Sequence, residues 1–468
     1  MDSRKIGRTG ARASTEPDAS DKSRLMSVPF PMVLALTLLV SGCLTHDPLS
    51  IPPGPETPPP GANLYVYVAE GRDEALENFG GAVSVYPLGA NGEFVEGPAT
   101  ASLPATNPRR LTVHPELDVL YVLTRNQVRA FDITGGGLRS LCQTPDTELR
   151  PPCATAPRPG SNPIDLTVRQ ADTGEWLLYV VEGGIPGDNA LSTRVSAFPL
   201  DERGGLPEFA GTVARNPDSL AFRGMAFSEI YLFATDGSLQ RIDRFDVKAD
   251  GALPLLIPTP TPFGQPTPTP TVAPTPTPPD QTPAPTPIPT PTPPQWYVPG
   301  PQRLRLGVAV QESLPRQLLY MISQNARRVY SYPLTDELDI EDDSAQTPRV
   351  DGLYEDILLD PQNRYIHATA FQMGRIDSFA LTADGMIDKS TSSSTLDNPA
   401  SYPGGMAWLT FTDAAGEVQN RVFVAQGGLN RVDAFPVDAD GSLIAEPATS
   451  SQAKDYSFPT DIAIFVDD

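Results

Sequence analysis

The chain repeats one short pattern of apolar and polar positions seven times. Each copy opens with a β-branched aliphatic residue and continues with two variable residues, an aromatic residue, then Pro, Asp or Ala, and a closing aliphatic residue. Apolar residues on alternate positions are typical of a half-buried β-strand. The seven copies are Val83–Leu88, Val128–Ile133, Val195–Leu200, Ile242–Val247, Val329–Leu334, Ile376–Leu381 and Val432–Val437.

A second strand pattern precedes each copy. It is an aliphatic, an aromatic and an aliphatic residue in six of the seven, and the remaining triplet, Arg364–Ile366, departs at its first residue. A turn follows most copies of the first pattern, as in Asn91-Gly92 and Asp440-Gly441, because tight hairpins need the positive φ that glycine supplies. The six regular triplets begin at Leu64, Leu120, Leu178, Ile230, Leu319 and Val422.

A further strand in each unit brings the count to four strands in each of seven units. Three neighbouring pairs of the repeated aromatic residues lie 45 to 47 residues apart, a spacing typical of propeller blades. We therefore predict an all-β, seven-bladed β-propeller rather than a pair of β-sandwiches. The C-terminal strand should complete the blade begun by Leu64 and so close the ring. The further strands are expected at Arg110–His114, Ile164–Val168, Ser219–Phe222, Leu304–Val308, Asp356–Leu359, Met406–Phe411 and Asp461–Val466.

The N-terminus has the order of an export signal. Residues 1–25 are a polar extension or a mis-assigned start, and residues 26–43 form an apolar run that ends in Val40-Ser41-Gly42-Cys43. The tetrapeptide resembles the lipobox of bacterial lipoproteins, which implies that Cys43 carries a lipid; an ordinary secretory signal with a chance cysteine is the alternative. Residues 44–62 are a Pro-rich tether. The residue after Cys43 is Leu44 and not Asp, which resembles the signal that directs Gram-negative lipoproteins to the outer membrane.

The propeller is expected to span residues 63–468, with a Pro/Thr-rich insert at 257–296. Proline lacks an amide donor, so the insert cannot join a sheet and should be extended. It is either a tolerated loop or a spacer or glycosylated stalk. Another insert holds Cys142 and Cys153, and an even pair of cysteines in an oxidising compartment predicts a disulfide.

Charge and composition exclude several classes of function. The net charge of −23 argues against nucleic acid and against electrostatic docking on anionic lipid. The three histidines (His46, His114 and His367) lack metal-ligand spacing, and His114 and His367 are interpreted as structural. We expect no metal and no cofactor, because the chain has no phosphate loop, no Cys-x-x-Cys motif and no Gly-x-Ser-x-Gly elbow.

Propellers bind ligands at the mouth of the central channel, which the loops after each second strand and before each first strand surround. Arg110 and Arg303 are candidates for holding an anionic substrate, with Glu70 or Glu182 as general base. The same side chains equally suit a merely solvated channel mouth. The candidate residues are Glu70, Arg72, Arg110, Asn126, Glu182, Asp236, Arg303, Gln324 and Gln426.

The blade consensus resembles the seven-bladed lactonase family, best known for hydrolysing 6-phosphogluconolactone. The resemblance is carried by the aliphatic-Tyr-Val strand, the Val-x-x-Tyr/Phe-Pro-Leu strand and the Asp-Gly turn, and by Asn-Pro steps such as Asn107-Pro108. It covers most of residues 64–468 and implies the propeller fold. The lipobox, the Pro-rich insert and the few histidines depart from soluble sugar-acid enzymes of the family.

These observations favour a membrane-anchored, extracytoplasmic lipoprotein that serves as a binding or assembly module of the cell envelope. The expected partners are the membrane, through lipid on Cys43, and an envelope protein or glycan; a monomeric propeller is expected. The alternative is a lactonase-like hydrolase of a sugar lactone or related ester, so whether the chain is an enzyme stays open. A third hypothesis makes the Pro-rich insert a cell-envelope spacer.

Overall fold

The computed structural model of the protein describes the strands and the shorter loops of the expected propeller. The N-terminal 62 residues, the Pro-rich insert, Cys142 and Cys153 lie outside the described residues. No helix in the part of the chain that is described is long and apolar enough to cross a membrane. The described residues are 63–71, 81–97, 99, 101–105, 107–125, 127–141, 154–155, 162–183, 193–207, 211–215, 222–228, 231–236, 241–253, 309–311, 317–323, 327–335, 340, 345–348, 352–395, 398–451 and 458–467.

The strands form seven antiparallel sheets, one for each expected blade. Strands within a sheet follow one another along the chain except in the first blade, where the C-terminal strand is innermost. Blade 1 holds β28 (Pro459–Asp467), β1 (Asn63–Glu70), β2 (Gly81–Leu88) and β3 (Ala101–Ala105). Blade 2 holds β4 (Arg110–Val113), β5 (Val119–Leu123), β6 (Val128–Asp132), β7 (Arg139–Ser140) and β8 (Ala154–Thr155). Blade 3 holds β9 (Asn162–Gln170), β10 (Trp176–Gly183), β11 (Arg194–Pro199) and β12 (Thr212–Arg215).

The other four blades follow the same plan. Blade 4 holds β13 (Phe222–Phe227), β14 (Tyr231–Asp236) and β15 (Arg241–Asp246). Blade 5 holds β16 (Ala309–Gln311), β17 (Leu318–Ser323), β18 (Arg328–Pro333) and β19 (Ala345–Gln346). Blade 6 holds β20 (Tyr354–Leu359), β21 (Tyr365–Ala370), β22 (Arg375–Leu381) and β23 (Ile387–Thr395). Blade 7 holds β24 (Pro403–Thr412), β25 (Val418–Gln426), β26 (Arg431–Pro436) and β27 (Thr449–Ser450).

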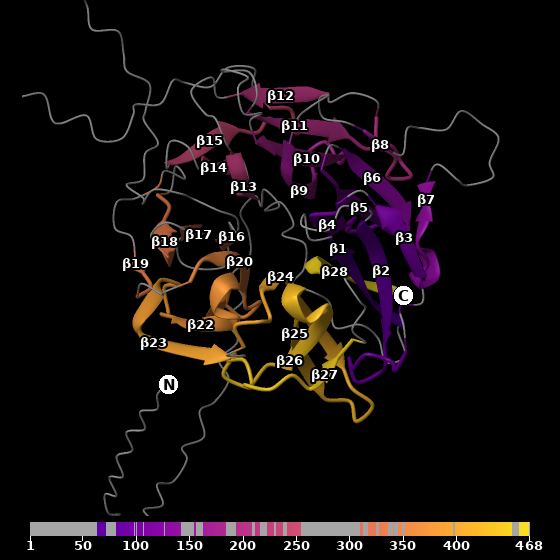
Figure 1. Ribbon diagram of the computed structural model, residues 1–468. Helices are drawn as coiled ribbons and strands as arrows, with labels where there is room; N and C mark the ends of the chain where they lie inside the picture. Colours follow the sequence, from indigo (N-terminus) through magenta and orange to yellow (C-terminus); the bar gives the residue numbers. More distant parts are fainter. Residues whose placement is uncertain are drawn as a thin grey trace, which may run out of the picture. The chain divides into compact units, whose positions relative to one another are not determined.

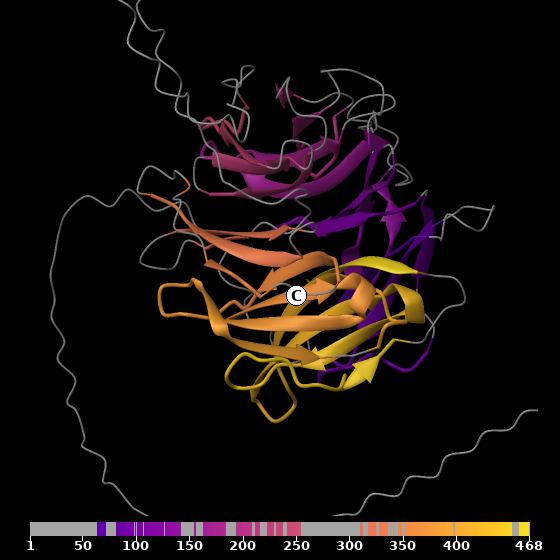
Figure 2. The ribbon, with the colours of Figure 1, turned by 60° about the vertical axis from the view of Figure 1, so that its left-hand side comes forward.

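The innermost strand of each blade surrounds the middle of the ring (Figure 1). The C-terminal strand β28 pairs antiparallel with β1, from Asn63 opposite Asp467 to Glu70 opposite Pro459. Turned by 60°, the ring shows the twisted sheets of blades 6 and 7 in front (Figure 2). The chain therefore has the seven-bladed β-propeller fold that the repeats predict.

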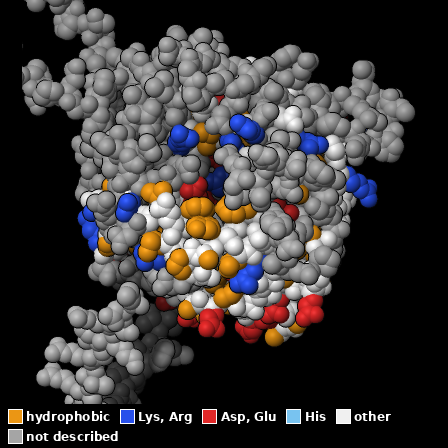
Figure 3. All heavy atoms as spheres, viewed as in Figure 1, with side chains coloured by type: hydrophobic (Ala, Val, Ile, Leu, Met, Phe, Trp, Pro, Cys, Tyr) orange, Lys and Arg blue, Asp and Glu red, His pale blue; other side chains and the backbone are white. Residues whose placement is uncertain are grey.

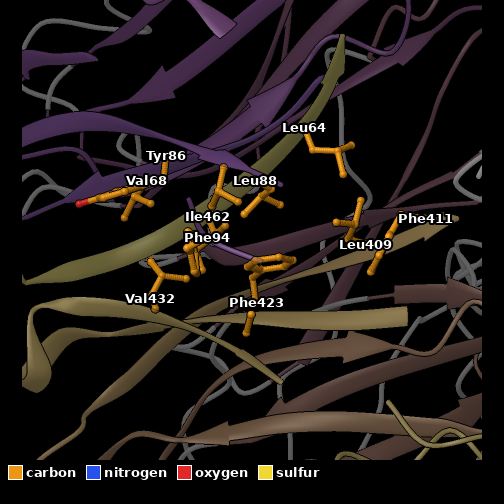
Figure 4. Close-up of a cluster of buried hydrophobic side chains, with 13 residues drawn as sticks. Leu64, Val68, Tyr86, Leu88, Phe94, Leu409, Phe411, Phe423, Val432 and Ile462 are labelled. Carbon is orange, nitrogen blue, oxygen red and sulfur yellow. The ribbon is translucent and has the colours of Figure 1, made fainter. Parts of the chain in front are cut away.

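Apolar side chains fill the spaces between blades. Within the described residues they form seven clusters, each shared by two neighbouring blades. The cluster between blades 1 and 7 is drawn in Figure 4, where Leu88 and Phe94 face Phe423 across the interface. The rings of Phe94 and Phe423 meet edge to face with centroids 5.6 Å apart. Each blade thus buries both faces of its sheet, which explains why its strands are apolar on alternate positions and on many positions between.

A tyrosine on the second strand ties several blades to the next one. The hydroxyl of Tyr121 donates a 2.8 Å hydrogen bond to the carbonyl of Gly204, and Tyr179 does the same to Gly251. Both glycines lie in the tight turn after the third strand of the following blade, with φ of 75° and 73°. The same bond joins Tyr67 to Gly137 and Tyr320 to Gly385.

The strand register corrects the sequence alignment of the second strands in three blades. Val66 pairs with Tyr86 as Leu120 pairs with Phe131, so Tyr67, not Tyr65, corresponds to Tyr121. Blades 4 and 6 show the same two-residue shift, which places Phe233 and His367 at the tyrosine position. A shift of two keeps every side chain on its face, so apolar alternation could not distinguish the two registers.

Two innermost strands differ from their expected positions. β13 begins at Phe222, where the expected segment ends, and runs on to Phe227. β16 is described only as Ala309–Gln311, whereas the expected segment 304–308 lies outside the described residues. The other five expected segments coincide with innermost strands.

Candidate functional site

Three aspartates on innermost strands each accept a hydrogen bond from the next blade at the channel. Asp461 of β28 accepts a 2.8 Å hydrogen bond from the Leu111 amide of β4. Asp165 of β9 accepts one of 3.1 Å from the Met225 amide of β13, and Asp356 of β20 accepts one of 3.0 Å from the Met406 amide of β24. In each case the carboxylate satisfies a backbone donor of the neighbouring innermost strand.

Arg110 reaches across the channel between two of these aspartates. Its guanidinium lies 3.1 Å from Asp461 Oδ1 and 3.7 Å from Asp356 Oδ1. Blades 2 and 6, which carry Arg110 and Asp356, are not neighbours in the ring, so the side chain spans the channel. The side chains of Arg110 and Asp356 keep 15% and 13% of their surface exposed. We call Arg110, Asp165, Asp356 and Asp461 the channel cluster.

The channel cluster has unusual protonation equilibria. Burial lowers the pKa of Arg110, but Asp461, Asp356 and Asp165 together outweigh burial and raise it above its ordinary value. Burial raises the pKa of Asp356 to about 7, although Arg110 opposes the rise. Burial also raises the pKa of Asp165 and of Asp461, again against the effect of Arg110. A partly exposed carboxyl that titrates near neutral pH beside a permanent cation suits proton transfer.

The space-filling view places charge at the centre of the ring. The face seen in Figure 3 is hollowed near the middle, and basic and acidic side chains meet in the hollow. With its carboxyls ionised, the channel cluster carries three negative charges against the one positive charge of Arg110.

The predicted site residues separate into two groups. Arg110 lies in the channel, whereas Glu70, Glu182 and Gln426 lie in the last two positions of the second strands of their blades and are buried. Glu182 accepts hydrogen bonds of 2.6 Å from Arg194 and 2.7 Å from Ser196 of the next strand. Arg72, Asn126, Arg303 and Gln324 lie outside the described residues, and the side chain of Asp236 is not described.

The tyrosine Tyr86 donates a 3.3 Å hydrogen bond to Glu70, so both predicted general bases have partners inside their own blades. Glu70 and Glu182 have 5% and 0% of their surface exposed. A general base must reach its substrate, directly or through one water. Asp356, whose side chain is 13% exposed, meets that requirement better than either glutamate.

The two described histidines belong to the packing between blades. His114 Nδ1 accepts hydrogen bonds of 3.1 Å from the amides of Glu116 and Leu117, and burial lowers its pKa to about 4. His367 lies 2.8 Å from the Ser378 hydroxyl, and burial lowers its pKa to about 3. Both rings are therefore neutral near pH 7, as suits structural side chains.

Sequence reasoning missed the three aspartates, although a signal existed. In four blades a proline precedes the channel-facing position by two residues, giving Arg110, Asp165, Gly405 and Asp461 at that position. The repeated Gly-Met-Ala-aromatic segment of β13 and β24 marks the amides that Asp165 and Asp356 latch. Aligning innermost strands on the proline would have brought Arg110, Asp165 and Asp461 to one position, whereas the strand of Asp356 carries neither feature.

Strained backbone precedes three of the innermost strands. Asn107, Tyr402 and Phe458 each precede the proline at or near the start of an innermost strand, with φ of 49°, 45° and 39°. Residues with a Cβ seldom adopt positive φ, least of all bulky ones. Such conformations concentrate at functional sites, so the starts of these innermost strands are candidates for ligand binding.

The comparisons with known proteins agree with this architecture. No protein-family model and no functionally curated protein matches the sequence. A putative 6-phosphogluconolactonase from Bacteroides fragilis covers 86% of the chain over 98% of its own length, with a TM-score of 0.57 and 16% identity. The chain has the fold of seven-bladed lactonase-like proteins.

Two further solved structures share that fold. A putative 6-phosphogluconolactonase from Bacteroides uniformis covers 86% of the chain and 99% of its own length, with a TM-score of 0.55 and 17% identity. The periplasmic gluconolactonase of Pseudomonas aeruginosa covers the same shares, with a TM-score of 0.57 and 15% identity. At these identities the likeness concerns the fold, and function must be argued from the channel itself.

Proposed function

We propose that the protein is an exported, lipid-anchored binding module that takes a neutral, polyhydroxylated ligand at its channel mouth. The N-terminal address and Cys43 support export and anchoring. The observation that carries the ligand class is the channel cluster, in which Arg110 is already engaged by Asp461 and Asp356. A phosphorylated sugar would have to compete with two carboxylates for that cation.

The test compares neutral and phosphorylated probes in equilibrium binding to the full chain. We expect neutral oligosaccharides such as cellotetraose or chitotetraose to bind, and glucose 6-phosphate to bind more weakly or not at all. Tighter binding of glucose 6-phosphate than of every neutral probe would overturn the proposed ligand class. Arg110→Lys, which keeps the charge, is the matched variant for separating electrostatic effects from the shape of the channel.

A second candidate function is hydrolysis of a neutral sugar lactone. It is favoured by Asp356, whose pKa of about 7 and partial exposure suit a general base that activates water. Water would add to the lactone carbonyl, the ring C–O bond would break, and the acid product would release a proton. Arg110 would stabilise the developing oxyanion. The periplasmic gluconolactonase of Pseudomonas aeruginosa has a similar fold. A gluconolactone without a phosphate group is a neutral substrate.

The hydrolase is tested by following proton release at constant pH with glucono-δ-lactone. Turnover above the spontaneous rate that disappears in Asp356→Asn would make the protein an enzyme with its site in the channel. If turnover does not exceed the spontaneous rate, the binding module is the better description.

A further inference from the structure

The segment that enters the innermost strand of blade 7 carries an exposed aromatic ring on a strained backbone. Tyr402 has 40% of its surface exposed and a φ of 45° immediately before Pro403. Two hydrogen bonds fix it in place, because the Gly427 amide donates to the Tyr402 carbonyl at 3.1 Å and the Gly428 amide donates to the Ser401 carbonyl at 2.8 Å. The surrounding structure therefore imposes this conformation rather than tolerating a loose loop.

Neighbouring groups shape a platform around that ring. The ring of Phe371, in the 3₁₀ turn η3 (Phe371–Met373) of blade 6, lies 5.2 Å from the Tyr402 ring, centroid to centroid. On the blade 7 side, a Cβ at Gly428 would lie 2.6 Å from Tyr402 Cδ2, so a side chain there would displace the ring. Gly428 belongs to the turn η4 (Gly427–Leu429). The ring thus rests between the turns of two blades with part of its surface open.

Unsatisfied polar groups lie beside this platform. The hydroxyl of Ser401 and both amide atoms of Gln426 are buried without a hydrogen-bond partner among the described residues. Gln426 pairs in register with Pro403, so its backbone runs directly alongside the Tyr402 segment. Burying three polar atoms without partners is costly, and native proteins seldom do so without a reason.

We infer that Ser401, Tyr402 and Gln426 form a subsite for one ring of a neutral saccharide. An aromatic face packs against the apolar face of a sugar ring, while amide and hydroxyl groups exchange hydrogen bonds with its hydroxyls. A saccharide hydroxyl supplies both a donor and an acceptor, which Gln426 requires. We call this group the Tyr402 subsite.

The subsite must open slightly to admit its ligand. Ser401 and Gln426 have 0% of their surface exposed, so a sugar hydroxyl reaches them only when the segment ending at Tyr402 shifts outward. Leaving the positive φ of Tyr402 would relieve backbone strain, whereas the hydrogen bonds from the Gly427 and Gly428 amides oppose the shift, so contacts with the ligand must compensate for their loss. Binding is therefore coupled to movement of the Tyr402 segment.

The strand β24, which begins directly after Tyr402, connects the subsite to a contact of the channel cluster. Tyr402 precedes Met406 by four residues, and the Met406 amide is the donor that Asp356 latches. Four strand residues span at most about 13 Å, so a short oligosaccharide can contact both. This inference rests on the proposed binding of a neutral saccharide and assigns it a definite contact.

The experiment titrates the full chain with cellotetraose and chitotetraose by calorimetry. Tyr402→Ala should weaken binding by about tenfold or more, because it removes the aromatic surface that covers the sugar. Tyr402→Phe keeps the ring and should bind within about twofold of the original chain. Each variant is measured at a temperature at which its thermal unfolding curve shows it fully folded.

Gln426→Met separates a ligand contact from a structural role. Methionine conserves volume and removes the unsatisfied amide, so the variant should unfold at the same or a higher temperature and yet bind the saccharide several-fold more weakly. A Gln426→Met chain that unfolds at a lower temperature, or that binds as tightly as the original, would overturn the subsite.

The outcomes distinguish this inference from the proposed function. Binding that is weakened by Asp356→Asn but unchanged in Tyr402→Ala would place the saccharide in the channel and refute the Tyr402 subsite alone. Failure of the original chain to bind either oligosaccharide at millimolar concentration would refute both.

Discussion

Replacing Arg110 with methionine tests whether the channel cluster is held together by charge. The substitution keeps much of the side-chain volume and leaves Asp461, Asp356 and Asp165 without the cation that raises the stability of their ionised forms. Asp461 and Asp356 lie 3.1 Å and 3.7 Å from the guanidinium. With an effective dielectric constant of about 20, each pair contributes roughly 5 kcal/mol of Coulomb energy, most of which offsets burial of the charges.

The net loss of stability should be about 3 kcal/mol at about pH 8, the lower end of the range for breaking a buried network, because the side chains of Arg110 and Asp356 are partly exposed. The loss should shrink on acidification. Arg110 holds the pKa of Asp356 down to about 7, so the variant has a still higher folded-state pKa and protonates more readily. A group whose folded-state pKa is raised gives stability that is present at low pH and lost as pH rises.

The assay is urea unfolding of both chains at about pH 8 and about pH 5.5, followed by far-UV circular dichroism. We expect the difference in unfolding free energy to fall to about half at the lower pH. Arg110→Lys, which retains the charge, should lose less stability than Arg110→Met at the higher pH. Equal destabilisation at both pH values would refute an electrostatic role and leave only lost packing.

Three further predictions follow from described contacts. Tyr121→Phe should lower the free energy of unfolding by about 1 kcal/mol, whereas Tyr332→Phe should be neutral or stabilising because the Tyr332 hydroxyl is buried without a partner among the described residues; matched urea titrations check both. The original chain should lose stability as pH rises from about 4 to about 7, by up to about 1.4 kcal/mol per pH unit, because the folded-state pKa of Asp356 is raised to about 7. Asp356→Asn should abolish this loss, and a variant with unchanged pH dependence would contradict the prediction. Gly405→Ala should destabilise the ring by more than about 1 kcal/mol, because the new Cβ would lie 2.1 Å from Asp461 Oδ1; an unaltered melting temperature would show that the two strands can separate at no cost.

The fold could be predicted because its signals are local and repeated. Alternating apolar residues, an aromatic at a fixed place and a glycine turn recur in each blade, and all three describe how one strand pairs with the next. The structure has seven blades with these strands, and Gly92, Gly251, Gly385 and Gly441 all adopt positive φ.

The candidate site was predicted only in part, since convergence around a ring is not local. Arg110 was found because it stands at the start of an expected first strand, where the loops of a propeller surround the channel mouth. Asp356 and Asp461 lie 246 and 351 residues further along the chain. The residues next to them in the sequence do not indicate that they contact Arg110. Glu182 was expected at the channel mouth, but its partners Arg194 and Ser196 lie on the adjacent strand and hold it inside the blade.

The sequence by itself determined the number of blades, the strand pattern and the export-like N-terminal segment, because each follows from residues close together in the chain. Tertiary structure decided the exact pairing of second strands, where a two-residue shift leaves the apolar pattern unchanged. It also decided which charged side chains face the channel and which are paired within a blade. Those choices depend on distances between strands from different blades, and only closing the ring brings Arg110, Asp356 and Asp461 together.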